Sequence, residues 1–192
     1  MVIALVIAIC FIYIEVVVNP IILNIAEAQV DSLGTTAVSD AIFEVINNEN
    51  VSYNDLVTIT YDDDNTVSSI VANMEKLNHL AREVSTKAQI LLDEMADKTV
   101  KVNLGAFTGF EAFAQYGPKI NLSLMPIGSV ITTFDSIFET AGINQTKHSI
   151  YVDVNTMISV VLPTSTKKIT FVTSALVCEC VIVGKVPDIS YL

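Results

Sequence analysis

Basic residues are scarce in this chain. Its 192 residues contain ten Lys and Arg against 21 Asp and Glu, which gives a net charge of −11. No Lys or Arg precedes Lys76, whereas residues 1–75 hold eleven acidic side chains and therefore carry the whole net charge. Such a surface repels nucleic acid and anionic lipid headgroups. We therefore predict no nucleic-acid partner; the acidity either keeps the protein soluble or offers a docking face to a basic partner.

Cysteine and histidine are also few. Cys178 and Cys180 are two positions apart on one predicted strand, so their Cα atoms lie about 6.5–7 Å apart on the same face, at the limit for a disulfide. The third cysteine, Cys10, lies far away in an apolar segment, and no disulfide framework is predicted. His79 and His148 are the only histidines, too few to complete a metal site with this cysteine pair.

Motifs for catalysis and nucleotide binding are missing from the sequence. There is no Gly-x-Ser-x-Gly elbow and no Gly-x-x-x-x-Gly-Lys loop. The Asp62-Asp63-Asp64 run lacks the alternating ligands of a calcium loop and is typical of a hairpin turn. We therefore predict no catalytic residue, no cofactor, no metal and no enzyme activity. An enzyme would require a pocket that joins His148 to Asp153 or Glu179.

Long apolar runs, in contrast, are present, and hydrophobic residues make up 52% of the chain. Residues Met1–Ile14 are all apolar, and Val16–Val18 extend the run past Glu15. Eighteen helical residues span about 27 Å, close to the hydrocarbon thickness of a bilayer. A signal peptide would need a basic start and a small-residue cleavage site, and neither is visible. We predict a transmembrane signal anchor over residues 1–18, whose orientation the positive-inside rule cannot assign.

Residues 19–192 are predicted to form a single α+β domain. An amphipathic helix is expected over Ile21–Ile46, with Pro20 at its start and a bend at Gly34. The β-rich runs Leu56–Tyr61 and Thr66–Ala72 predict a hairpin. A second long helix, amphipathic through Met95, should begin after an N-cap at Asn73.

The rest of the chain predicts a mainly antiparallel sheet with long C-terminal strands. Short strands are expected over Thr99–Leu104 and Lys119–Met125, joined by a loop that carries four aromatic residues. Gly128 should separate the second of these from a strand over Ser129–Phe138. The alternation over His148–Leu162 turns Ile150, Val152, Val154, Ile158, Val160 and Leu162 inward. The apolar strand Lys168–Val183 is expected to be central because both of its faces are apolar late in the strand.

A series of glycine-punctuated strings stands between Leu104 and His148. They are Leu104-Gly105-Ala106-Phe107-Thr108-Gly109, Gly117-Pro118-Lys119-Ile120, Pro126-Ile127-Gly128-Ser129-Val130 and Gly142-Ile143-Asn144-Gln145-Thr146-Lys147-His148. In this order and spacing they resemble the sporulation protein YunB family of endospore-forming bacteria, and the resemblance runs from Asn19 to Pro187. The residues that carry it, expected to have a structural or interaction role, are Gly105, Thr108, Gly109, Gly117, Pro118, Lys119, Ile120, Gly142, Ile143, Asn144, Gln145, Thr146, His148, Gly184 and Pro187. From the residues alone, Asn144, Gln145 and His148 should close a turn and satisfy backbone groups.

The resemblance implies a membrane-anchored, non-enzymatic protein of endospore formation, a structural or interaction module of the spore envelope. It implies a single-pass topology with an extracytoplasmic domain, in the mother-cell membrane or the membrane around the forespore. The expected partners are the membrane and other sporulation envelope proteins, with a homo-oligomer left open. A second hypothesis from the residues is a tethered domain that binds lipid or another apolar ligand in a groove between strands and helix.

Overall fold

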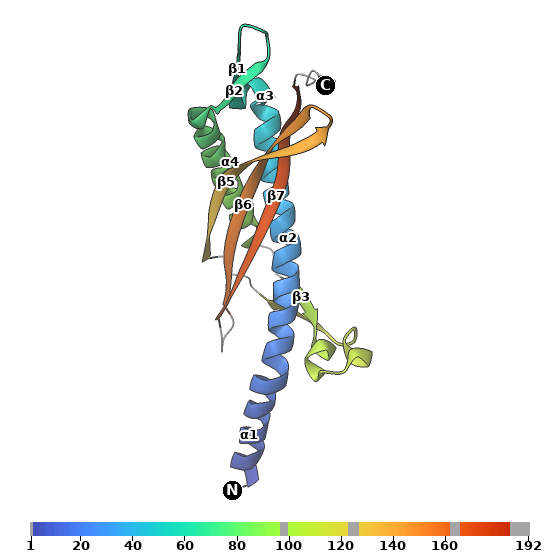
Figure 1. Cartoon of the computed structure of the whole chain (residues 1–192). Coiled ribbons are helices and arrows are strands. Elements are labelled where there is room, and N and C mark those ends of the chain that lie inside the picture. The colour runs from blue at the N-terminus through green and yellow to red at the C-terminus, as the bar shows by residue number, and fades with distance from the viewer. Residues whose placement is uncertain (1, 97–99, 123–126, 162–165, 185–192) are drawn as a thin grey trace. The chain divides into compact units, whose positions relative to one another are not determined.

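The computed structural model describes residues 2–96, 100–122, 127–161 and 166–184 (Figure 1). Its helices are α1 (Val2–Tyr13), η1 (Ile14–Val18), α2 (Asn19–Asn48), α3 (Tyr53–Leu56), α4 (Met74–Ala96), η2 (Leu104–Thr108) and η3 (Glu111–Phe113). Its strands are β1 (Val57–Tyr61), β2 (Val67–Ala72), β3 (Val100–Asn103), β4 (Lys119–Leu122), β5 (Ile127–Gly142), β6 (Gln145–Val161) and β7 (Thr166–Val183). This element order confirms the predicted α+β class.

Within the described residues the strands form three sheets: β1 with β2, β3 with β4, and β5-β6-β7 in that order. The predicted hairpin is confirmed, since β1 pairs antiparallel with β2 and Ile59 faces Ile70. The prediction that the last strand is central is wrong, because β6 occupies the middle and β7 an edge. Only one apolar row of β7, including Ile169 and Phe171, is buried, whereas Val172 in the other row is exposed. Apolar residues on both faces of a strand therefore do not show that the strand is central.

The chain divides into two compact units. One comprises Met1–Ala37, Gln89–Ser129 and Thr156–Phe171, and the other comprises Val38–Ala88, Val130–Asn155 and Val172–Leu192. The five longest elements, α2, α4, β5, β6 and β7, each contribute residues to both units. The single domain expected over residues 19–192 stays a prediction.

The N-terminal helix is uninterrupted from Val2 to Asn48, so the expected restart at Pro20 does not occur. Proline has no N–H and its ring crowds the carbonyl four residues earlier. The helix accommodates this by widening into a π-turn at η1, where the Asn19 N–H bonds the Ile14 carbonyl oxygen five residues back. Among the described residues, this helix is the one that is long and apolar enough to cross a membrane, and its most apolar window is not buried.

In the unit that contains Val38–Ala88, α4 contacts both α2 and the strand β5. Lys87 of α4 forms an ion pair with Glu44 of α2 at 2.6 Å, and Lys76 of α4 forms one at 2.7 Å with Glu49, the residue that follows α2. Ser85 of α4 donates a hydrogen bond to Thr132 of β5 at 2.8 Å. The buried apolar residues of this unit are Val38, Ala41, Ile42, Val45, Leu56, Val57, Leu77, Leu80, Val84, Ala88, Ile150, Val152 and Val154. The predicted amphipathic character of α4 is thus confirmed.

Two glycines in the unit that contains Gln89–Ser129 stand where the chain packs closely. Gly34 of α2 is covered by the Phe171 ring, which a Cβ would overlap, so this glycine permits close helix–strand packing. Gly128 was expected to break a strand but lies within β5. A Cβ there would overlap the carbonyl oxygen of Met157 in β6, so glycine is needed because the two backbones approach closely.

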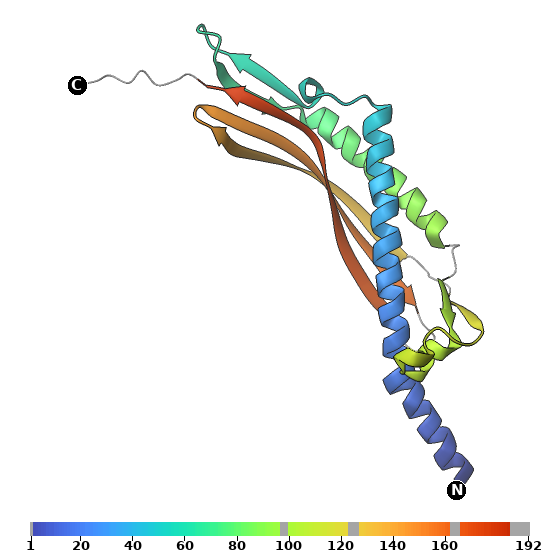
Figure 2. The same ribbon diagram turned by 90° about the vertical axis from the view of Figure 1, so that its right-hand side faces the viewer.

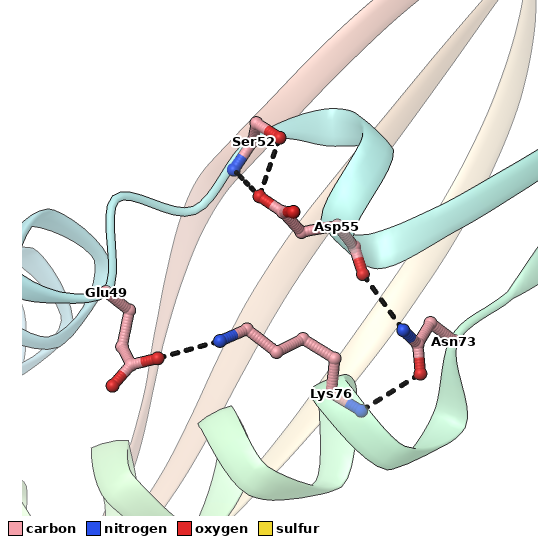
Figure 3. A network of polar contacts seen from close by, with 5 residues as sticks. All are labelled: Glu49, Ser52, Asp55, Asn73 and Lys76. Carbon is pink, nitrogen blue, oxygen red and sulfur yellow. Dashed lines mark hydrogen bonds and ion pairs between the residues drawn. The ribbon is translucent and has the colours of Figure 1, made fainter.

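The start of α4 is fixed by a polar network (Figure 3). The predicted N-cap is confirmed: the Asn73 Oδ1 accepts a hydrogen bond from the Lys76 N–H at 3.2 Å. The Asn73 Nδ2 also donates to the Asp55 carbonyl oxygen at 3.2 Å, which joins α4 to the short helix α3. The Asp55 carboxylate in turn accepts from the backbone N–H and hydroxyl of Ser52, at 2.8 and 2.6 Å.

Candidate functional site

The most unusual polar group in the interior is His148, on β6. Its side chain is only 2% exposed. Its Nδ1 lies 2.6 Å from the hydroxyl of Tyr53 in α3, and its Nε2 lies 2.7 Å from the hydroxyl of Ser136 in β5. The ring stacks on Phe138 with centroids 4.1 Å apart and an interplanar angle of 4°. Both ring nitrogens are therefore satisfied by side chains, as a buried imidazole requires.

Burial keeps the groups around this histidine uncharged. It lowers the pKa of His148 below its usual value, so the ring is neutral at neutral pH. Burial likewise raises the pKa of Tyr53 to about 12 and that of the Cys178 thiol to about 11. A protonated thiol is a poor nucleophile, so Cys178 is suited to packing rather than to covalent chemistry.

The expectation that His148 closes the preceding turn is wrong. The turn lies at Ile143 and Asn144, and β6 already begins at Gln145. Because side chains alternate along a strand, His148 falls on the same face as Ile150 and Val152, which are buried. The imidazole therefore enters the core and bonds side chains instead of backbone groups.

The acidic residues considered for an enzyme are not gathered around this histidine. The Glu179 carboxylate accepts a hydrogen bond from the Ser149 hydroxyl at 3.1 Å and lies 3.6 Å from the Lys147 ammonium. Ser149 neighbours His148 on the strand and therefore faces the opposite side of the sheet. Asp153 lies five positions after His148 on β6, so its side chain also faces the side of the sheet opposite to His148. His148 therefore contacts hydroxyl and aromatic side chains, but neither the Asp153 nor the Glu179 carboxylate is its partner.

A cavity of about 440 Å³ lies beside His148, within one unit. The hairpin, α4, β5 and β6 all contribute walls, which are mostly apolar. Val57 and Ile70 come from the hairpin, Leu77 and Ala81 from α4, and Phe134 from β5. His148 and Ser136 are polar groups in the lining. Its size falls within the range of small-molecule sites.

The first group of family-motif residues builds one compact loop between β3 and β4. The Gly105 N–H bonds the Tyr116 carbonyl oxygen at 2.8 Å, and the Leu104 N–H bonds that of Pro118 at 2.9 Å. Lys119 and Ile120 follow in β4, where Ile120 pairs with Val102. Gly109 and Gly117 have φ values of 75° and 97°, which glycine adopts without strain. A Cβ on Gly105 would overlap the Phe113 carbonyl oxygen, so the loop requires this glycine too.

This loop is attached to the apolar N-terminal helix (Figure 2). The Tyr13 hydroxyl lies 3.1 Å from the Thr108 carbonyl oxygen and 3.3 Å from that of Phe107. The Thr108 hydroxyl donates to the Gly105 carbonyl oxygen at 2.7 Å and so holds the turn together. Gly109 faces Val17 on the helix. No local pattern predicts this attachment, because its partners are 95 residues apart in the chain.

The second group of family-motif residues meets at the turn between β5 and β6. Asn144 takes a positive φ of 61°, and its carbonyl oxygen accepts a hydrogen bond from the Gly184 N–H at 2.7 Å. Gly142, Gln145 and Thr146 flank this turn, and Ile143 at its tip is 91% exposed. Pro187 lies outside the described residues. The motif residues thus form two clusters, one in each unit, and their roles stay predictions.

Asp62, the first residue of the aspartate run, holds the hairpin turn through its side chain. Asp62 Oδ1 accepts hydrogen bonds from the backbone N–H of Asp64 and Thr66, at 3.1 and 2.9 Å. This is the turn-forming use of aspartate that the hairpin prediction implied. Over the described residues, no three His, Cys, Asp or Glu side chains are grouped in a way that could hold a metal ion.

Comparison with known proteins confirms the predicted resemblance. The family model of the sporulation protein YunB matches residues 99–189, which include both motif clusters. The sporulation protein YunB of Bacillus subtilis (strain 168) is 22% identical over 181 residues, covering 89% of this chain and 71% of the relative. No solved structure matches this chain.

Proposed function

We propose that this chain, whose residues 99–189 match the sporulation protein YunB family, supports endospore formation as a membrane-anchored, non-enzymatic protein. The family match carries the proposal, since both clusters of motif residues lie within it. The packing of His148 in the interior, where its ring bonds Tyr53 and Ser136 and stacks on Phe138, favours a structural role for this residue.

The apolar N-terminal helix supports the anchored part of the proposal. Its most apolar window is unburied, which a soluble core helix would not tolerate. We propose a single-pass topology with the remaining residues outside the cytoplasm, at the mother-cell membrane or the membrane around the forespore. The partners would be the membrane and other envelope proteins of sporulation, and chemical crosslinking in sporulating cells would test whether the chain also forms a homo-oligomer.

Deletion of the gene tests the role in sporulation. We expect the deletion strain to grow normally but to form fewer heat-resistant spores, with the full chain restoring the yield. An unchanged spore yield in a strain without a second homologue would refute the proposed role.

Cysteine labelling tests the topology. Asp63 lies in the exposed hairpin turn, so Asp63→Cys offers a reporter thiol once Cys10, Cys178 and Cys180 are changed to Ala. We expect a membrane-impermeant thiol reagent to label this variant on intact cells, and the same chain without the reporter cysteine to give only the background. Labelling that appears only after lysis would place the hairpin in the cytoplasm.

A second candidate function, binding of an apolar ligand, is favoured by the cavity beside His148. Its volume of about 440 Å³ and mostly apolar walls suit a lipid chain or similar molecule. Organic extraction of the purified chain followed by mass spectrometry tests this. We expect a bound apolar compound in the parent and none in Ala81→Phe, which fills the cavity. No compound in the parent would remove this candidate.

A further inference from the structure

The Leu104–Gly117 loop displays three large aromatic side chains that the core does not use. Phe110 is 68% exposed, Phe113 55% and Tyr116 70%. Phe110 and Phe113 contact each other edge to face, with ring centroids 6.4 Å apart. Exposed aromatic side chains gathered on one short, hydrogen-bonded loop indicate an interaction surface. We call Phe110, Phe113 and Tyr116 the aromatic face.

The loop that carries the aromatic face is fixed to the proposed membrane anchor. Tyr13 bonds the loop through the Thr108 carbonyl oxygen at 3.1 Å, and Val17 contacts the loop at Gly109. Both helix residues lie at the end of the apolar run, beside Glu15. The aromatic face therefore lies at the level where the anchor would leave the hydrocarbon.

The chemistry of the loop fits the interfacial layer rather than the hydrocarbon core. Its irregular backbone exposes polar groups that hydrocarbon cannot satisfy, whereas headgroups and water can. Tyr and other aromatic side chains concentrate at this level in membrane proteins. No Lys or Arg occurs between Lys101 and Lys119, so binding would rest on the aromatic rings and not on anionic headgroups.

We propose that the aromatic face inserts into the interfacial layer of the bilayer that the N-terminal helix crosses. This inference rests on the proposed membrane anchor. The loop would then be a second point of attachment, which fixes how the unit containing it stands on the membrane surface and limits its rotation about the helix.

Tryptophan fluorescence tests the proposal, because the chain has no tryptophan of its own. The full chain is reconstituted into phosphatidylcholine vesicles with acyl chains brominated at a shallow or a deep carbon. The loop is probed with Phe110→Trp, and Tyr116→Trp serves as a second loop probe. Ile9→Trp reports on the anchor, and Phe43→Trp replaces a phenylalanine of α2 that is equally exposed, at 73%.

We expect blue-shifted emission from both loop probes, quenched more by shallow than by deep bromines. Ile9→Trp should be quenched by both lipids, and Phe43→Trp should emit as in water without quenching. Quenching of Ile9→Trp without quenching of the loop probes would overturn the inference and leave the anchor intact. An unquenched Ile9→Trp would overturn the anchor and the inference together. Equal quenching of Phe43→Trp would also overturn it, because contact would not be specific to the loop.

Discussion

At the scale of single residues, the buried imidazole of His148 shows how the interior accommodates a polar side chain. Its two nitrogens are bonded by Tyr53 and Ser136, and its ring stacks on Phe138. The strand that carries it was predictable from alternation, and the same alternation, extended two positions back from Ile150, would have placed His148 in the core. Its hydroxyl partners come from α3 and β5, and no local pattern in the sequence connects them.

Removing this imidazole should destabilise the protein. His148→Ala leaves a cavity and two hydroxyl groups without their partner, so we expect a loss of about 2–4 kcal/mol in the free energy of unfolding. Urea unfolding of the full chain in detergent, followed by circular dichroism, measures this. The matched control is His79→Ala, an exposed histidine on α4, which should change stability by less than about 0.5 kcal/mol. Equal effects of the two substitutions would contradict the structural role of His148.

The same residue should make stability depend on pH. Because burial lowers the pKa of His148, the unfolded chain binds a proton at a higher pH than the folded chain does. The contribution of His148 to the free energy of unfolding is therefore fully present at pH values above its ordinary pKa of 6.5, and it is lost as the pH falls below that value. The slope should be at most about 1.4 kcal/mol per pH unit. His148→Gln should lose this slope and His79→Ala should keep it; a parent without the slope would refute the assignment.

At the scale of elements, sequence patterns located most helices and strands but not their contacts. The hairpin, α4 and its N-cap follow from local patterns, because turn residues, helical spacing and capping act over a few positions. The short helix α3 was missed although Ser52 and Asp55 have capping spacing. Gly128 was misread as a strand break, because a glycine demanded by a neighbouring backbone looks the same in sequence as a glycine in a turn.

The close approach at Gly128 predicts a large effect from a small change. An added methyl group in Gly128→Ala would overlap the Met157 carbonyl oxygen and force β5 and β6 apart, so we expect a loss of about 1–3 kcal/mol. The neighbouring Ser129 is exposed, and Ser129→Ala should be nearly neutral in the same urea unfolding measurement. A neutral Gly128→Ala would show that the strands are not so tightly spaced.

The network at the start of α4 predicts a smaller effect. Asn73→Ala removes the cap on the Lys76 N–H and the link to the Asp55 carbonyl oxygen, so about 1 kcal/mol of stability should be lost. Asn78 lies inside the same helix, where alanine has the higher helix propensity, so Asn78→Ala should be neutral or stabilising. Thermal unfolding of both variants beside the parent gives the comparison. A loss in Asn78→Ala that matched the loss in Asn73→Ala would argue against a capping role.

At the scale of the whole molecule, the acidity of the first 75 residues is partly offset on folding. Lys87 from α4 pairs with Glu44 of α2, and Lys76 pairs with Glu49 just after α2, which weakens the case for the first helix as a docking face for a basic partner. Ion pairs between partly exposed groups contribute little to stability, so their effect is mainly on the surface potential. The apolar segment and the family resemblance could both be recognised from sequence, whereas the attachment of the motif loop to the helix required the structure.

The central claim, that this chain supports endospore formation from a membrane, is tested most directly by complementation. In a deletion strain of its own spore-forming host, the parent chain is compared with Leu5→Arg/Ile9→Arg, which places two charges in the apolar helix, where each is strongly disfavoured. The measurement is the count of heat-resistant spores at equal protein levels. We predict that the parent restores the count and that the double variant does not. Full restoration by the double variant, or a deletion strain with a normal count, would contradict the account.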